Sequence, residues 1–373
     1  MAEIRFSVAG LRIPFKTSFK QASSVRNTGE SVWVVIERNG IQAFGEGCPR
    51  IYVTGETLES AIGWINEQLP DLRTRVTDLP SLHAWMEEQR TAIDENPAAF
   101  CAVETALVDL FAKEQNKTVE ALLGLAEPGR VYQYTAVVGD GSADKFMGLV
   151  EQYLEWGFND FKLKINGDLA TDIAKFEILS AASVKAGRSS VQIRLDANNL
   201  WAGQKDLAIE HLKQLPKQWI GIEEPIAPKE PQALSEISTT LGQGIILDES
   251  LCNRQDILAY DALPGKYIAN LKVARLGGVL RSLEMVRLLQ TRNWPIIVGA
   301  HVGETSVLTR AAMLVANAAG QQLIAQEGAF GTVLLDYDRV SPSLRFGAGG
   351  RLDLREYKFN NTPGWGLTLA EDN

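Results

Sequence analysis

The chain has 373 residues, of which 45% are hydrophobic and 22% are charged, and its formal net charge is −9. A single hydrophobic core rarely grows beyond about 250–300 residues, so this length predicts two structural units. The acidic charge is not gathered into runs and no basic stripe is present, which argues against a nucleic-acid partner.

Neither a targeting segment nor a membrane span is expected. The start of the chain lacks a basic stretch followed by an apolar run, and nowhere does the chain approach about eighteen consecutive apolar residues. The three cysteines, Cys48, Cys101 and Cys252, are too widely spaced for a metal-binding or redox pair, so we expect reduced thiols. Together these features predict a cytoplasmic protein.

Residues 1–128 are expected to form an α+β unit. The apolar segments 4–8 and 31–37 predict strands, and Asn39-Gly40 predicts the turn of a hairpin. The polar stretch 15–27 is predicted to be a mobile loop. Apolar residues at three- and four-residue spacing from 57 to 125 predict helices.

From residue 129 to 340, short apolar runs alternate with longer amphipathic segments. The runs are 131–138, 161–165, 191–196, 219–223, 244–248, 267–272, 295–298 and 322–325. Eight such runs predict a (β/α)8-type barrel, in preference to an open doubly wound sheet, because no G-x-G-x-x-G follows an early strand. The Gly- and Pro-rich tail 341–373 is expected to fold back onto the N-terminal unit.

Charged residues recur where the predicted barrel strands end. They are Lys162 and Lys164 on the second strand, Asp196 on the third, Glu223 on the fourth, Asp248 on the fifth and Lys272 on the sixth. Active sites of such barrels lie at the C-terminal ends of the strands. One charged strand end is usually solvated or paired, but the recurrence on consecutive strands favours a shared site.

Three carboxylates on consecutive strands, from Asp196, Glu223 and Asp248, would repel one another across a common cavity, and a bound cation would resolve that repulsion. Ligation by oxygen alone, without His or Cys, favours a hard ion, Mg²⁺ or Mn²⁺. The sequence therefore predicts a metal site on this side of the barrel.

The two outer lysines are placed by the strand count. The second and sixth strands are four apart of eight, so Lys164 and Lys272 should face each other across the mouth. That layout suits removal of a proton from one face of a carbon and its return on the other. Lys162 lies on the same strand face as Lys164, so each should depress the pKa of the other.

These motifs together resemble the enolase superfamily, in its muconate-lactonizing-enzyme subgroup of the mandelate racemase/muconate lactonizing enzyme family. The matching residues are Lys162 and Lys164 in K-x-K, Asp196 and Asn198 in D-A-N, Glu223 in E-E-P, Asp248 in D-E-S, and Lys272. The resemblance implies a modified (β/α)7β barrel with an α+β capping domain, one Mg²⁺ and an enolate intermediate. It also favours Glu223 over Glu224 as the ligand.

The resemblance leaves the reaction open, because the same lysine pair serves racemases, epimerases, cycloisomerases and succinylbenzoate synthases. Residues 53–57 (VTGET) resemble the capping loop of dipeptide epimerases. Those enzymes carry a D-x-D after the eighth strand that binds the substrate ammonium, where this chain has Gln326-Glu327-Gly328.

We expect a small carboxylate substrate, an amino-acid derivative or dipeptide-like acid, that is racemised or epimerised by a homo-oligomer. A cycloisomerase or a syn-elimination is the alternative, and a catalytically silent binding protein is a remote one.

Several side chains are expected to contact the substrate: Tyr52, Thr135, Asn198, His301, Glu304 and Glu327. Glu327 would either contact the substrate or, through a hydrogen bond, orient the side of the barrel that carries the lysines or the metal ligands. A catalytic His301 would imitate the mandelate-racemase branch, which has an Asp where this chain has Lys272, so a substrate contact or structural bond is expected instead. Candidates for a distal acidic or amide group are Lys16, Lys20, Arg26, Arg50 and Tyr52.

Overall fold

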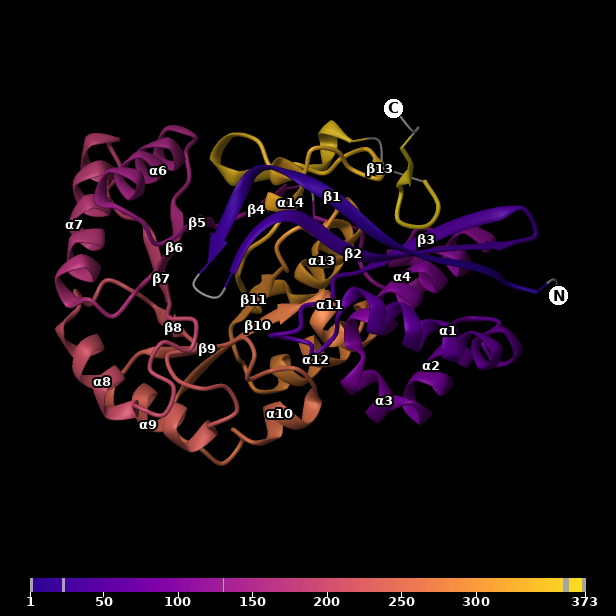
Figure 1. Cartoon of the computed structure of the whole chain (residues 1–373), viewed down its shortest axis with the longest axis horizontal. Coiled ribbons are helices and arrows are strands. Elements are labelled where there is room, and N and C mark those ends of the chain that lie inside the picture. The colour runs from indigo at the N-terminus through magenta and orange to yellow at the C-terminus, as the bar shows by residue number, and fades with distance from the viewer. Residues whose placement is uncertain (1–2, 22–23, 130, 358–361, 371–373) are drawn as a thin grey trace.

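The structure, a computed structural model, describes residues 3–21, 24–129, 131–357 and 362–370. The N-terminal part is an antiparallel three-stranded sheet followed by helices (Figure 1). Its elements are β1 (Arg5–Gln21), β2 (Ser24–Arg38), β3 (Ile41–Gly47), α1 (Leu58–Arg75), α2 (Leu79–Glu88), α3 (Arg90–Glu95), α4 (Pro97–Glu114) and α5 (Val119–Leu123).

The predicted hairpin turn is confirmed between β2 and β3. Asn39 and Gly40 have φ angles of 53° and 77°, the left-handed backbone that a two-residue hairpin turn requires. The loop predicted for residues 15–27 is wrong, because β1 and β2 stay paired there, with Phe19 opposite Arg26. Apolar alternation reports which strand face is buried, so a paired segment with polar side chains gives no such signal.

Helix α4 is the centre of the N-terminal core. Every residue from Pro97 to Ala112 is buried, and the helix lies directly on β3. A Cβ atom on Gly47 would lie 1.8 Å from the carbonyl oxygen of Ala98, and one on Gly45 would lie 2.3 Å from that of Ala102. Glycine at both positions therefore permits the close approach of strand and helix.

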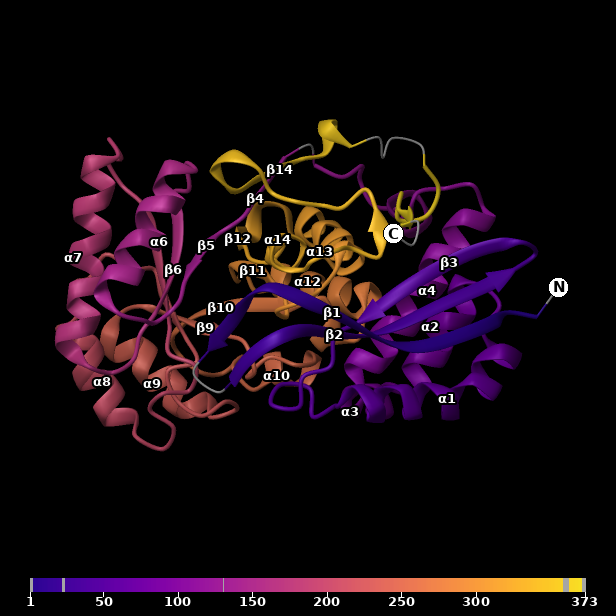
Figure 2. The same cartoon turned by 45° about the horizontal axis from the view of Figure 1, so that its top comes forward.

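The second part is a curled parallel sheet of eight strands, whose order β12-β11-β10-β9-β8-β7-β6-β5 follows the chain (Figures 1 and 2). The strands are β5 (Ala136–Val138), β6 (Asp160–Lys164), β7 (Gln192–Asp196), β8 (Gly221–Glu223), β9 (Gly244–Leu247), β10 (Lys266–Lys272), β11 (Ile296–Gly299) and β12 (Leu323–Gln326). The two edges meet where the Thr135 N–H donates to the Gln326 carbonyl oxygen at 2.9 Å.

Helices connect successive strands. They are α6 (Ala143–Glu155), α7 (Leu169–Lys185), α8 (Lys205–Gln214), α9 (Pro231–Leu241), α10 (Arg254–Leu258), α11 (Val273–Leu276), α12 (Val279–Thr291) and α13 (Ser306–Ala319). Among the α-helices of the described residues, only the five-residue α14 (Phe330–Leu334) follows the last barrel strand, β12. The predicted (β/α)7β barrel is thus confirmed.

The first predicted strand, 131–138, is in fact divided. Its first half is β4 (Val131–Gln133), which pairs with β14 (Arg351–Asp353) of the tail, and only its second half, β5, joins the barrel. The two halves are separated at Tyr134, whose N–H donates to the Gly350 carbonyl oxygen of the tail at 2.8 Å. Apolar runs alone do not reveal that one run serves two sheets.

The tail crosses back over the N-terminal part. Its elements are β13 (Val340–Ser341), which pairs with β15 (Thr368–Leu369), the short helices η2 (Ala348–Gly350) and η3 (Leu354–Glu356), and β14, while η1 (Gly320–Gln322) precedes β12. Trp365 is buried against α4, where its backbone N–H donates to Asp109 at 2.9 Å and its indole N–H to the Thr105 carbonyl at 3.0 Å.

Two buried glutamates of the N-terminal part bind the beginnings of barrel helices. Glu104 accepts hydrogen bonds from the N–H groups of Val279 and Leu280 in α12, at 3.1 and 2.7 Å. Glu46 accepts hydrogen bonds from the N–H and the hydroxyl of Thr305, the residue before α13. The first N–H groups of a helix have no partner within it and favour negative charge, so these contacts join the two parts.

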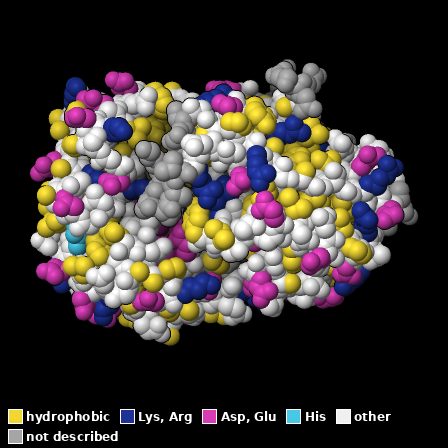
Figure 3. All heavy atoms as spheres, viewed as in Figure 1, with side chains coloured by type: hydrophobic (Ala, Val, Ile, Leu, Met, Phe, Trp, Pro, Cys, Tyr) yellow, Lys and Arg dark blue, Asp and Glu magenta, His cyan; other side chains and the backbone are white. Residues whose placement is uncertain are grey.

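Charged side chains of both signs lie on the surface of the protein (Figure 3). On the face shown in Figure 3, cationic and anionic side chains are interspersed. Of the described helices, none is both long and apolar enough to cross a membrane.

Candidate active site

The predicted site residues stand at one level of the barrel. In the parallel register Lys164 lies opposite Asp196, and Asp196 lies opposite Glu223. Asp248 follows β9 directly and Lys272 is the last residue of β10. Parallel strands all carry their C-terminal ends at the same mouth, so the fold brings these side chains together.

Lys162 lies at the centre of the carboxylates. Its Nζ is 2.7 Å from Glu223 Oε2, 3.0 Å from Glu327 Oε2 and 3.6 Å from Asp196 Oδ2. Burial acts to lower the pKa of Lys162, but the carboxylates of Glu223, Glu327 and Asp196 outweigh burial and raise it above its ordinary value. The expectation of a depressed Lys162 pKa is therefore wrong for this arrangement.

Asp248 is held by two cations from the next strand and turn. Lys272 Nζ lies 2.6 Å from Asp248 Oδ2, and the buried Arg275 of α11 donates to Asp248 Oδ1. Arg275 also donates to the carbonyl of Asn270, which fixes the turn that follows β10. The side chain of Lys272 is thereby anchored at the mouth.

The neighbouring acid, Glu224, makes different contacts from Glu223. Glu224 accepts hydrogen bonds from the N–H groups of Asp248 and Ser250, at 2.7 and 2.8 Å, and from the Ser250 hydroxyl at 2.8 Å. Burial raises the pKa of Glu224 to about 7. Glu224 thus shapes the loop that carries Asp248, whereas Glu223 faces Lys162 inside the barrel.

The three predicted ligands, Asp196, Glu223 and Asp248, are buried, and each faces at least one cationic side chain. Their oxygens do not form a group in which all lie within 4.8 Å of one another. The donor set is made of hard carboxylate oxygens on adjacent strands, which fits Mg²⁺ and, by the same chemistry, Mn²⁺.

Lys164 lies on the opposite side of the mouth from Lys272. Strands β6 and β10 are separated by β7, β8 and β9 in the eight-stranded sheet. Lys164 Nζ donates to Asn198 Oδ1 at 2.5 Å and lies 3.5 Å from Asp196 Oδ2. Asn198 adopts a left-handed backbone, with a φ of 46°, and its N–H donates to Asp196 Oδ1 at 3.0 Å. Asn198 therefore orients both the lysine and the acid.

A buried ion pair behind Lys164 was not predicted from the sequence. Lys175 of α7 donates to the Lys164 carbonyl oxygen at 2.8 Å and lies 3.0 Å from Asp172 and 2.9 Å from Asp140. Asp172 in turn accepts the N–H groups of Asn166 and Gly167, at 3.1 and 3.0 Å. In the sequence, this ion pair is visible only as an acid and a lysine three residues apart near the start of the helix that follows Lys164. That spacing is equally typical of an ion pair on the surface of a helix.

We expect Lys175→Met to reduce kcat/KM by about 10- to 100-fold, because the backbone carrying Lys164 loses its anchor and small displacements of a reacting group cost that much. Steady-state kinetics with a substrate that wild type turns over would measure it. The control is Lys185→Met on the same helix, where the exposed ammonium pairs with Glu151 at the surface. Equal rates for Lys175→Met and the control would contradict the expectation.

Two further predicted contacts belong to one interior network. Thr135 is fully buried, donates to Asp160 at 2.6 Å and accepts from Arg194 at 2.7 Å, so its hydroxyl is engaged inside the barrel and not at the mouth. Arg194 lies 3.6 Å from Glu327, which Lys162 also contacts. Burial opposes ionisation of Glu327, but Lys162 and Arg194 hold its pKa below the ordinary value. Glu327 therefore orients Lys162.

The residues that the sequence offers as contacts for a distal group of the substrate lie in different surroundings. Arg50 is buried and donates to the carbonyls of Glu30, Pro49 and Val302, so it clamps the loop after β3 to the loop after β11 and is not open to a ligand. Tyr52 is 46% exposed. The Arg26 guanidinium lies 5.5 Å from the centroid of the Tyr52 ring. Lys16 is exposed, and the side chain of Lys20 is outside the described part.

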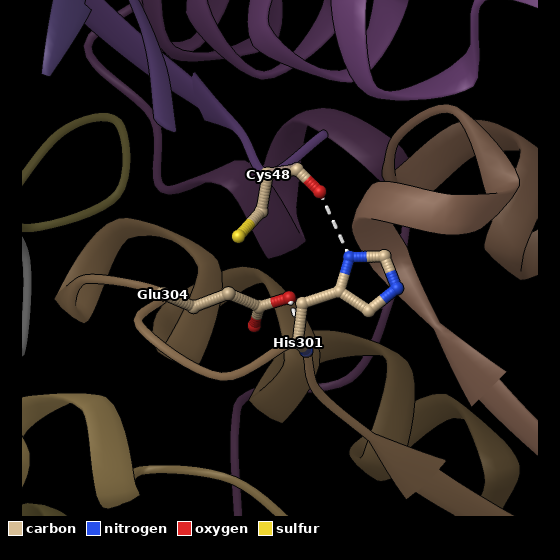
Figure 4. A group of neighbouring side chains, drawn as sticks. All are labelled: Cys48, His301 and Glu304. Carbon is tan, nitrogen blue, oxygen red and sulfur yellow. Dashed lines mark hydrogen bonds between the residues drawn. The ribbon is translucent and has the colours of Figure 1, made fainter. Parts of the chain in front are cut away.

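The loop after β11 carries His301 and Glu304, both buried (Figure 4). His301 Nδ1 is 2.8 Å from the Cys48 carbonyl oxygen, and Glu304 accepts the His301 backbone N–H at 2.8 Å. Burial raises the pKa of Glu304 to about 8. These contacts join the barrel mouth to the end of β3.

Comparison with protein families settles the ancestry of this arrangement. Residues 145–373 match the model of the enolase C-terminal domain-like family, and residues 3–124 match the N-terminal domain of mandelate racemase/muconate lactonizing enzyme. The chain belongs to the mandelate racemase/muconate lactonizing enzyme family. The resemblance inferred from the sequence motifs is thus confirmed.

Curated relatives in this family match over almost the whole chain. A hydrophobic dipeptide epimerase of Enterococcus faecalis is 25% identical over 355 residues, which cover 94% of this chain and 96% of that protein. An N-succinyl-L-Arg/Lys racemase of Bacillus cereus is 23% identical over 373 residues, which cover 97% of this chain and 94% of that protein. Both relatives are isomerases, the enzyme class expected from the sequence.

A solved structure within the family has the same fold. It is a dipeptide epimerase from Enterococcus faecalis complexed with Mg and the dipeptide L-Leu-L-Tyr, with a TM-score of 0.82 and 22% identity. The match covers 99% of this chain and 100% of that chain.

Proposed function

We propose that this member of the mandelate racemase/muconate lactonizing enzyme family removes the proton from the carbon next to a substrate carboxylate and returns a proton on the opposite face. The observation that carries the proposal is the position of Lys164 and Lys272 on strands across the mouth, with Asp196, Glu223 and Asp248 between them. The reaction is a racemisation or epimerisation.

Each lysine serves one face of the reacting carbon. In one direction the neutral amine of the first lysine accepts the proton, and the ammonium of the second donates one from the other side. Return from the same face would restore the starting isomer, so inversion requires two opposed groups. The catalytic direction reverses when the roles of the lysines reverse.

The acidic residues make this proton removable. Asp196, Glu223 and Asp248 would hold Mg²⁺, which when bound stabilises the second negative charge that develops on the substrate carboxylate. Lys162 places positive charge beside Glu223 and Asp196, and Glu327 holds the Lys162 ammonium in position. Asn198 aims Lys164 at the mouth.

The end of β12 bears on the substrate class. The charge of Glu327 is already balanced by Lys162 and Arg194, and the Gln326 amide donates to the Tyr134 hydroxyl at 3.1 Å. A free ammonium group would find no carboxylate there that lacks a cation. The proposed substrate is accordingly an amino-acid derivative or dipeptide-like acid whose reacting carbon carries an acylated nitrogen.

The test is α-proton exchange in D₂O, followed by NMR, with Mg²⁺ and a panel of dipeptides, N-acetyl and N-succinyl amino acids and betaines. We expect the α-proton signal of a true substrate to disappear while the second isomer appears. Protein treated with a chelator is the control. If no panel member exchanges its α-proton above that control, the proposal fails, and an unsaturated product in place of the isomer would instead favour syn-elimination.

A further inference from the structure

His301, in the loop after β11, has a ring nitrogen without a hydrogen-bond partner among the described residues. His301 Nε2 is buried and accepts no hydrogen bond among the described residues. The other ring nitrogen, Nδ1, lies 2.8 Å from the Cys48 carbonyl oxygen. A carbonyl oxygen only accepts, so Nδ1 carries the proton.

The ring is neutral in this environment. Burial, together with the nearby charges of Lys272 and Arg50, lowers the pKa of His301 well below its ordinary value. A neutral imidazole protonated at Nδ1 has a lone pair at Nε2, so Nε2 can only accept a hydrogen bond. An unsatisfied acceptor of this kind is costly to bury and needs an explanation.

A metal ion shared with Cys48 and Glu304 does not provide that explanation. Potential ligand atoms of the three residues lie within 4.8 Å of one another. However, Nδ1 is the ring nitrogen that faces Cys48, it is protonated, and Nε2 points away from both Cys48 and Glu304 (Figure 4). Burial also raises the pKa of the Cys48 thiol to about 12, which disfavours the thiolate that a metal requires.

The position of His301 associates it with the proposed reaction. Gly299, two residues earlier, pairs with Lys272 across β10 and β11, and a Cβ atom on Gly299 would lie 3.1 Å from Lys272 Cε. The cations whose charges act on the His301 ring are Lys272, Arg50 and Arg275. His301 therefore lies on the side of the mouth from which Lys272 serves the reacting carbon.

We propose that His301 Nε2 accepts a hydrogen bond from a neutral N–H group on the reacting carbon, the amide N–H of an N-acylated amino acid or of the C-terminal residue of a peptide. Lys272, Arg50 and Arg275 would repel an ammonium group here, whereas an amide N–H carries no net charge. This inference rests on the proposed function and names the group that specifies its substrate.

A pair of matched probes tests the inference: N-acetyl-L-leucine and the ester in which oxygen replaces its N–H. Two variants separate the ring nitrogens. His301→Asn can keep the hydrogen bond to the Cys48 carbonyl through its amide but lacks an atom at the Nε2 position, whereas His301→Gln can reach that position with an acceptor oxygen.

For each protein, binding of both probes is measured by calorimetry with Mg²⁺ present, and α-proton exchange is measured by NMR. We expect wild type to favour the amide over the ester by about 10-fold, the contribution of one hydrogen bond, and His301→Gln to retain part of that ratio. His301→Asn should bring the ratio close to one.

An unchanged ratio in His301→Asn, or a wild type that binds neither probe or does not favour the amide, overturns the inference. The proposed function is judged separately, by whether wild type exchanges the α-proton of any panel member. If exchange is present while the amide-to-ester ratio does not depend on His301, only the inference fails. If exchange is absent throughout, both fail.

Discussion

Lys164→Ala and Lys272→Ala are each expected to lower the rate of isomer interconversion by at least about 100-fold, since a general acid or base typically contributes 10²- to 10⁴-fold. The two variants should differ in which isomer still exchanges its α-proton. Each variant keeps the lysine on one face, so it should still exchange the α-proton of one isomer with D₂O while failing to exchange that of the other. The isomer that remains active should be opposite in the two variants.

The measurement is NMR of α-proton loss from each pure isomer, with circular dichroism to confirm folding. Lys145→Ala, an exposed lysine on α6, is the control for mutation of a lysine to alanine. If either active-site variant interconverts the isomers at the wild-type rate, the assignment of two opposed bases is wrong. Loss of exchange from both isomers in both variants would indicate that the lysines act jointly on one face.

The second large effect is expected at the carboxylates. Glu223→Gln should weaken Mg²⁺ binding by at least about 10- to 100-fold. Loss of a residue that only hydrogen-bonds a metal ligand typically lowers metal affinity by that factor, and loss of a charged ligand itself should lower it at least as much. Activity should fall with it and should recover in part at high Mg²⁺. Removing metal from wild type with a chelator should abolish proton exchange, and added Mg²⁺ should restore it.

The adjacent position provides the matched comparison for Glu223. Glu224→Gln changes the same functional group one residue away, but Glu224 binds the backbone of Asp248 and Ser250. Glu224→Gln should therefore lower the midpoint temperature of thermal unfolding more than Glu223→Gln does. Titration calorimetry and thermal melting separate the two effects, and a larger loss of Mg²⁺ affinity in Glu224→Gln would mean that the ligand was assigned to the wrong acid.

The sequence predicted site residues best where an apolar run, typical of a buried strand, ends in a charged residue. Buried parallel strands appear in the sequence as apolar runs, and a charged residue that ends such a run must lie at the mouth of the barrel. Asp196, Glu223 and Lys272 could therefore be placed from the sequence alone. The same logic set Lys164 across from Lys272. Their chemical roles remain predictions that the experiments above test.

Environments assembled from distant segments were not predictable. For Lys162, the sequence shows only that Lys164 is near, whereas the carboxylates that together outweigh burial and raise its pKa, Glu223, Glu327 and Asp196, come from other strands or follow them. Arg50 is only a candidate ligand contact from the sequence, because nothing in its sequence context shows that it binds the carbonyl of Val302. Thr135 was misplaced for the same reason, since its partner Arg194 lies 59 positions away.

The junction between the two parts of the chain has a consequence for how the protein folds. Glu104 accepts from the first N–H groups of α12 and Glu46 accepts from Thr305 before α13, so an isolated barrel fragment would leave these groups without their acceptors. In an isolated N-terminal fragment, Glu104 would lose both of these hydrogen bonds, and Glu46 would lose those from Thr305 while keeping the one from the Ser31 hydroxyl. Neither fragment is complete by itself. The whole chain should therefore unfold as one cooperative unit, and access to the mouth should depend on local loop movement without separation of the two parts.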